Sequence, residues 1–199
     1  MQRTALIFVC LFVAVSAHAA TLKMPAAPVI ELELGDGEIP RPLSVGLFVP
    51  DDVKNEIFVV KTSPFDRIKY PIGGYTVDVF ATNLPQVFSK VTDVGGPKAA
   101  EVDLVIEVDI VRFEATIPSP ASHPYTSTAV YKITVRNSRG VPLLVQTVTG
   151  DGQTSEGMLS GFKAKRLAAE SAARAMAEAA KQALEALADA PELEEVRKP

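Results

Sequence analysis

The chain has 199 residues, of which 47% are hydrophobic, with no tryptophan, one cysteine and a net charge of −4. This length corresponds to one ordinary domain, which can bury its own core without disulfides or metals. The acidic balance argues against nucleic acid as a partner, and the few aromatic residues argue against a surface that stacks on carbohydrate.

Residues 1–19 have the pattern of a secretory signal peptide. Arg3 provides a positive start, Ala5–Val15 is an unbroken apolar run, and Ala17-His18-Ala19 is a small-x-small cleavage site. We expect cleavage near Ala19, with Val15-Ser16-Ala17 as the alternative site. The protein is then periplasmic or secreted, and any association with the membrane does not use a spanning helix.

Two alternatives to cleavage are an uncleaved N-terminal anchor and a lipoprotein acylated at Cys10. Large apolar residues flank Cys10 on both sides, where a lipidated cysteine needs a small residue before it. We therefore expect release rather than lipidation. Removal of residues 1–19 takes away Arg3 and leaves 19 of the 20 basic residues against 24 acidic residues, a net charge of −5. The mature chain then has no disulfide, thiol nucleophile or cysteine ligand.

An extended proline-rich leader is expected over residues 20–42, with one short strand at Val29–Leu34 where polar and apolar residues alternate. Short apolar runs predict strands at Leu43–Val49 and Glu56–Lys61. Residues 62–72 are expected to be a loop because of their prolines and mixed polarity.

Apolar residues at helical spacing predict a helix from Tyr75 to Lys90, which Pro85 should kink or stop. The next element is a long strand, Val102–Ile117. Its apolar set changes phase by one residue near Ile110–Arg112, which predicts a β-bulge there.

A hairpin follows, made of strands Tyr125–Arg136 and Val141–Thr149 around an Asn137–Gly140 turn in which Gly140 supplies a positive φ. Residues 150–161 are expected to be a glycine-rich loop. An alanine-rich helix then covers Phe162–Ala188 and carries a stripe of small residues along one face.

That helix would be about 40 Å long, whereas an average strand of six residues covers about 20 Å, so part of the helix is expected to overhang the sheet. The expected fold class is α+β: an antiparallel or mixed sheet of four to five strands, packed on one face by two helices. A single domain spans residues 43–190, and residues 191–199 form a charged tail.

Three carboxylates, Asp103, Glu107 and Asp109, share one face of the predicted long strand. They could bind a hard cation, but a solvated outer sheet face is favoured, because such a cation takes more oxygen ligands than this face offers. We therefore predict no metal site.

His123 is the one histidine left after cleavage, and it lies among prolines beside Ser119 and Ser122. No nucleophile–base–orienter set can be assembled around it, so a surface histidine is favoured over a hydrolase site. The glycines at 150, 152, 157 and 161 miss the Walker spacing, so we expect a loop and a cap at Ser160 or Gly161 rather than a phosphate site. We predict no catalytic residue and no cofactor.

The order of elements, together with the residue pattern V-D-L-V-I-E-V-D-I at 102–110, resembles the YajG-like bacterial envelope lipoproteins and the small α/β modules of the TolB N-terminal type. The similarity covers residues 42–187. This chain differs from the lipoproteins at Cys10, because the residues around that cysteine do not form a lipidation site. The resemblance implies a non-enzymatic accessory or assembly protein of the cell envelope.

We therefore expect a protein partner or a homo-oligomer, in contact through the carboxylate-bearing sheet face or the overhanging helix. The alternative function is a small-molecule or lipid carrier in the periplasm, with its ligand held between the helices and the bent strand.

Overall fold

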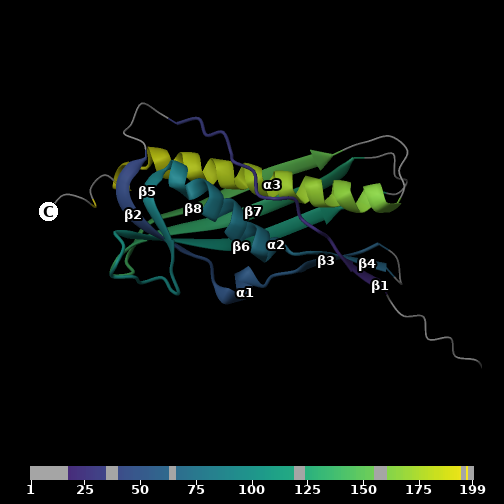
Figure 1. Cartoon of the computed structure of the whole chain (residues 1–199), viewed down its shortest axis with the longest axis horizontal. Coiled ribbons are helices and arrows are strands. Elements are labelled where there is room, and N and C mark those ends of the chain that lie inside the picture. Colours follow the sequence, from purple (N-terminus) through teal and green to yellow (C-terminus); the bar gives the residue numbers. More distant parts are fainter. Residues whose placement is uncertain are drawn as a thin grey trace, which may run out of the picture.

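A five-stranded mixed sheet forms the body of the structure, which is a computed structural model that describes residues 18–34, 40–62, 66–118, 124–154, 161–193 and 196 (Figure 1). Its strand order is β5-β2-β6-β7-β8, and β2 runs parallel to both of its neighbours. The antiparallel run β6-β7-β8 and the mixed sheet confirm the predicted fold class. The strands are β2 (Arg41–Phe48), β5 (Phe88–Asp93), β6 (Leu104–Thr116), β7 (Tyr125–Asn137) and β8 (Pro142–Thr154).

The predicted bulge is present in β6. Its register against β7 slips between Ile110 and Arg112, and Val111 is left 58% exposed. The slip keeps Phe113 on the same face as Ile106 and Val108, so that the core-facing side of the strand continues across the bulge. The predicted turn is confirmed as well, since Gly140 has φ +83°.

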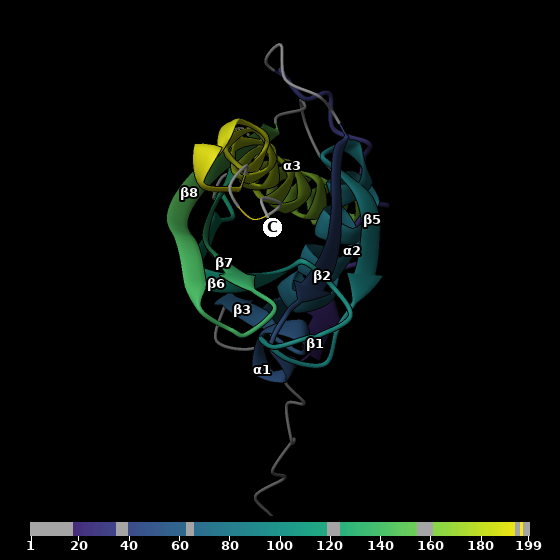
Figure 2. The same ribbon diagram turned by 90° about the vertical axis from the view of Figure 1, so that its left-hand side faces the viewer.

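Two helices cover one face of this sheet, as expected (Figure 2). They are α2 (Ile72–Asn83) and α3 (Gly161–Asp189), and the sheet curls around both of them. Tyr131 of β7 lies at the centre of the core, with Phe80 of α2 packed edge-on against its ring. The hydroxyl oxygens of Tyr131 and Thr76 are 3.0 Å apart.

The helix predicted to reach Lys90 ends earlier. Pro85 lacks the N–H that would continue the hydrogen-bond ladder, so α2 stops at Asn83 and a 3₁₀ turn, η1 (Leu84–Gln86), follows. Phe88 then begins β5, which pairs in parallel with β2. This strand was missed because Phe88 and Val91 also fit the helical spacing.

A second, three-stranded sheet was not expected. Its order is β1-β4-β3, with β1 at His18–Thr21, β3 at Phe58–Lys61 and β4 at Asp66–Tyr70. The prediction of a loop over 62–72 is therefore wrong for β4. The prediction of a strand at 56–61 is confirmed by β3. A one-turn helix, α1 (Asp51–Lys54), precedes β3.

Aromatic side chains join the two sheets. The ring centroid of Phe113 lies 5.1 Å from that of Phe58 and 5.7 Å from that of Tyr70. The small sheet therefore covers the end of β6 beyond the bulge. Strand β1 includes residues on both sides of the predicted cleavage point at Ala19, and residues 1–17 lie outside the described part.

Residues 22–34 cross the helical layer without secondary structure, so the predicted strand at Val29–Leu34 is wrong. Ile30 is nevertheless 8% exposed and belongs to the core. Its N–H donates to the side-chain oxygen of Asn83, 2.8 Å away, and its carbonyl accepts from Gln86. Side chains of α2 and η1 supply the hydrogen bonds that a neighbouring strand would otherwise provide.

Candidate binding surfaces

The long edge strand β8 offers the largest set of free backbone groups on the described sheet. It has 13 residues and pairs on one side only, with β7. The sequence predicts it only to Thr149; residues 150–154, expected as loop, extend the strand instead.

The backbone groups of alternate β8 residues point away from β7. The carbonyl of Gln153 accepts from Arg174 of α3 at 2.8 Å, so it is directed away from β7. The N–H of Asn137 donates to the carbonyl of Val141 at the turn, but the β7–β8 register slips between Arg136 and Val135, so Val141 lies outside this phase. Because antiparallel partners alternate between bonded and non-bonded pairs, Val145, Thr147, Thr149 and Asp151 also direct their N–H and C=O groups outward. The same residues place their side chains on the outer face, where each is exposed.

The extension of β8 is made possible by two glycines that lie against α3. A Cβ at Gly152 would lie 2.0 Å from the carbonyl oxygen of Ser171, and a Cβ at Gly150 would lie 2.2 Å from that of Ala175. The glycine cluster thus permits close helix–strand contact, and the small-residue stripe of α3 packs on its own sheet, which was the favoured interpretation.

The predicted overhang of α3 is confined to its first turns. A strand of 13 residues is about 43 Å long, and a helix of 29 residues has about the same length. The strands are about twice as long as expected from the sequence, so they match most of the helix. The last strand residue, Thr154, donates its hydroxyl to the carbonyl of Leu167, and Figure 1 shows the start of α3 extending past β8. Lys163, Lys165 and Arg166 are exposed there.

The three candidate carboxylates do not form one cluster. Asp103 precedes β6 and accepts 2.7 Å hydrogen bonds from the N–H and the hydroxyl of Ser44. Glu107 forms a 2.8 Å ion pair with Arg136 of β7. Among the described residues, no group of three or more His, Cys, Asp and Glu side chains could hold a metal ion.

Asp109 lies opposite Lys132 in the β6–β7 pairing, at the edge of an acidic patch that includes Glu107 and Asp52. Burial raises the pKa of Asp109, as do Glu107 and Asp52, while Lys132 acts in the opposite direction. The pKa of Glu56 is raised in the same way, by burial first and then by Asp52 and Asp109.

The patch makes a pH-dependent contribution to stability. A carboxyl whose pKa is raised by folding binds its proton more tightly in the native state, so stability falls as the pH rises through that raised value. Asp109→Asn should therefore increase the free energy of unfolding at pH 7, as measured by urea denaturation. The increase should vanish below about pH 3, where the carboxyl is protonated in both states. A gain of equal size at pH 3 and pH 7 would contradict this account.

The predicted surface histidine His123, its neighbours Ser119 and Ser122, and the predicted cap Ser160 lie outside the described residues. Within the described ranges, no helix has the combination of length and apolarity that crossing a bilayer requires.

No family model matches the sequence, and no curated protein matches it. Several solved structures are similar. Protein XCC0632 of Xanthomonas campestris, of the family designated DUF330, shares 12% identity over 86% of this chain and 93% of its own, with a TM-score of 0.49. A minor lipoprotein of Acinetobacter baumannii shares 9% identity over 73% of this chain and 90% of its own, at 0.43.

The hypothetical protein CT253 of Chlamydia trachomatis shares 10% identity over 75% of this chain and 99% of its own, also with a TM-score of 0.43. Of these three similar structures, the Acinetobacter protein is the one named as a lipoprotein.

Proposed function

We propose that this protein is a non-enzymatic accessory or assembly protein of the bacterial cell envelope, which binds another protein along the free edge of β8. The observation that supports the proposal is the 13-residue edge strand with outward N–H and C=O groups. A partner segment in extended conformation would pair with these groups by β-strand addition.

The composition of β8 favours an added strand. Natural edge strands are usually protected by lysine, proline, bulges or short length. The opposite edge, β5, has six residues and carries Lys90. In β8, Pro142 and the register slip against β7 next to it lie at the start of the strand, and the residues that point outward beyond them include Val145, Thr147 and Thr149.

Charge and shape restrict the partner. Asp151 is the one charged residue of β8, and its carboxylate accepts a 2.6 Å hydrogen bond from Thr128. The side chains of Val145 and Thr147, which lie on the outer face, are both β-branched. We therefore infer a partner strand with β-branched or apolar residues on this face and a basic residue opposite Asp151.

A binding role accounts for the charged groups without catalysis. Glu107 is engaged by Arg136, and Asp103 by Ser44. These contacts stabilise the sheet. The proposed interaction uses the backbone of β8 and does not require these side chains. The predicted signal peptide favours an interaction in the periplasm or outside the cell.

Proline at position 147 tests the proposal. Thr147→Pro removes an outward N–H that β7 does not use, so the fold should be retained while strand addition is blocked. A photo-reactive residue at Thr149, introduced in cells, should give one discrete adduct with a partner. We expect Thr147→Pro to reduce that adduct at least tenfold and Thr147→Ala to retain it.

Two results would overturn the proposal. One is an adduct that is equally strong in Thr147→Pro and Thr147→Ala, provided that both purified variants melt cooperatively. The other is an adduct that joins two copies of this chain, which would assign the edge to self-association.

A further inference from the structure

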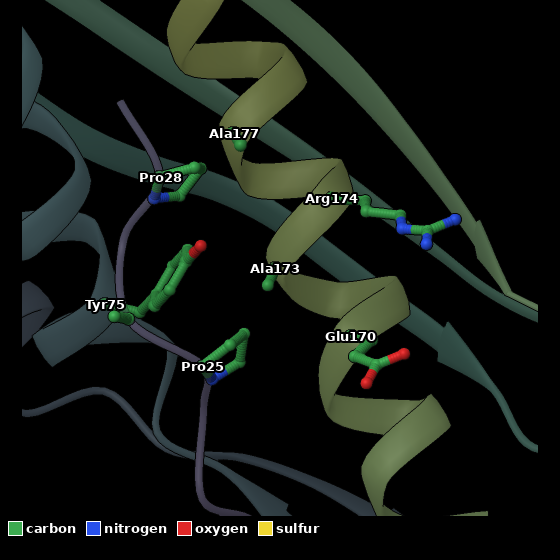
Figure 3. Close-up of a pocket in the computed structure, with 8 residues that line it drawn as sticks. Pro25, Pro28, Tyr75, Glu170, Ala173, Arg174 and Ala177 are labelled. Atoms are coloured by element: carbon green, nitrogen blue, oxygen red, sulfur yellow. The ribbon is translucent and has the colours of Figure 1, made fainter. Parts of the chain in front are cut away.

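An apolar pocket lies between the two helices and the extended segment that crosses them (Figure 3). It has a volume of about 240 Å³. Residues 25–28 form one wall, α3 forms another, and Tyr75 of α2 lies between them. A site between the helices matches the carrier alternative, except that the extended segment closes it rather than the bent strand β6.

The walls of the pocket are apolar and offer little to a charged ligand. Pro25 and Pro28 have no N–H to donate, and Ala173 and Ala177 contribute methyl groups from α3. The charged groups near the rim are engaged elsewhere: Arg174 donates to the carbonyl of Gln153 at 2.8 Å, and Glu170 pairs with Arg166 at 3.5 Å. Figure 3 shows the side chains of Arg174 and Glu170 directed away from Tyr75.

Tyr75 places one polar atom in this apolar setting. Its side chain is buried, with 3% of the residue exposed, and among the described residues its hydroxyl has no hydrogen-bond partner. Figure 3 shows the hydroxyl directed towards α3, between Pro28 and Ala173. A buried hydroxyl without a partner is unfavourable, and a ligand that accepts a hydrogen bond from it would remove this cost.

The hydroxyl is suited to act as a donor. Burial, and to a smaller extent Asp78, raise the pKa of Tyr75 to about 12, so the group stays protonated at neutral pH. Because the surroundings disfavour negative charge at this point, they also disfavour an anionic ligand.

We propose that this pocket binds an uncharged, mainly apolar molecule that carries one hydrogen-bond-accepting oxygen, with the Tyr75 hydroxyl as the donor. The volume is below the range of about 300–1,000 Å³ that is usual for drug-sized ligands, which restricts the ligand to a short alkyl alcohol, ester or similar compound. This site is separate from the β8 edge, and the proposal does not depend on the one made for β8.

Binding of 1-octanol, followed by amide chemical shifts of the purified protein, tests the site. We expect shifts centred on Tyr75, Ala173 and Ala177, with octanoate binding at least tenfold more weakly. Tyr75→Phe should weaken octanol binding about three- to tenfold, the effect of one hydrogen bond, without loss of stability. Ala177→Leu fills the pocket from its half-exposed wall and should abolish binding. The matched control, Ala164→Leu in the overhanging turn of α3, should bind as the original protein does.

Three outcomes would overturn this proposal: no octanol binding by the original protein, equal octanol affinity in Tyr75→Phe, or octanoate binding as tightly as octanol. Unfolding curves of each variant separate these outcomes from misfolding. If no ligand accepts a hydrogen bond from the hydroxyl, Tyr75→Phe should only raise the free energy of unfolding, because it removes an unpaired polar group.

Discussion

Gly152→Val should destabilise the protein by about 3 kcal/mol or more, since it inserts a side chain where β8 and α3 are in backbone contact. The first added carbon would lie 2.0 Å from the carbonyl oxygen of Ser171 and 2.5 Å from the amide nitrogen of Ala175. These are atoms of the helix backbone, which cannot turn away as a flexible side chain would. The strand must therefore separate from the helix, and the cluster around Leu167 and Ala172 opens.

Urea denaturation measures this effect as a lower unfolding midpoint. Gly150→Val should behave similarly, because its Cβ would lie 2.2 Å from the carbonyl of Ala175. Gly95→Val is the matched control: apart from Gly95 and its two chain neighbours, no residue has a heavy atom within 4 Å of a Cβ there. We expect Gly95→Val to change the stability by less than about 0.5 kcal/mol. An unchanged midpoint for Gly152→Val would show that β8 and α3 are not closely packed.

Local alternation of side chains was sufficient to predict the long antiparallel strands. The phase change at Ile110–Arg112 is a property of adjacent residues, so the bulge could be placed before any partner strand was known. Gly140 was assigned its positive φ for the same reason, since a tight turn is a local structure.

The strands that were missed depend on distant partners. In β5 one residue in six, Phe88, is buried, so no alternation is visible; its pairing with β2 makes it a strand. In β4, Tyr70 is the one buried residue and nearby prolines favour a loop. Gly150 and Gly152 are typical of loops, and only the approach of α3 explains why β8 continues through them.

The candidate sites were beyond prediction for related reasons. That β8 is an edge follows from the order of all five strands, which local patterns do not determine. Tyr75 was assigned to a helix correctly, but its unpaired hydroxyl depends on the course of residues 25–28 across that helix. No sequence signal identifies that course, because side-chain hydrogen bonds, rather than a strand pairing, fix it.

Those hydrogen bonds converge on Asn83, and Asn83→Ala should cost about 2–4 kcal/mol. The Asn83 side chain is fully buried. Its oxygen accepts from the Ile30 N–H at 2.8 Å and from the side-chain amide of Gln86 at 2.9 Å. Its nitrogen donates to the carbonyls of Pro28 at 3.0 Å and Val79 at 2.8 Å. In Asn83→Ala, the N–H of Ile30 and the carbonyl of Pro28 lose these hydrogen-bond partners.

The expected result has a local as well as a global component. Residues 23–34 have no strand partner, so the loss of Asn83 should release this segment before the sheet unfolds. Hydrogen exchange of the Ile30 amide should accelerate at least tenfold in Asn83→Ala while the amides of β7 remain protected. Asn55→Ala removes an exposed 2.7 Å hydrogen bond to Asp51 and should leave both measurements unchanged. If Ile30 exchanges at the same rate in Asn83→Ala, another contact holds the segment in place. Because Pro25 and Pro28 belong to this segment, its release should also open the wall of the Tyr75 pocket.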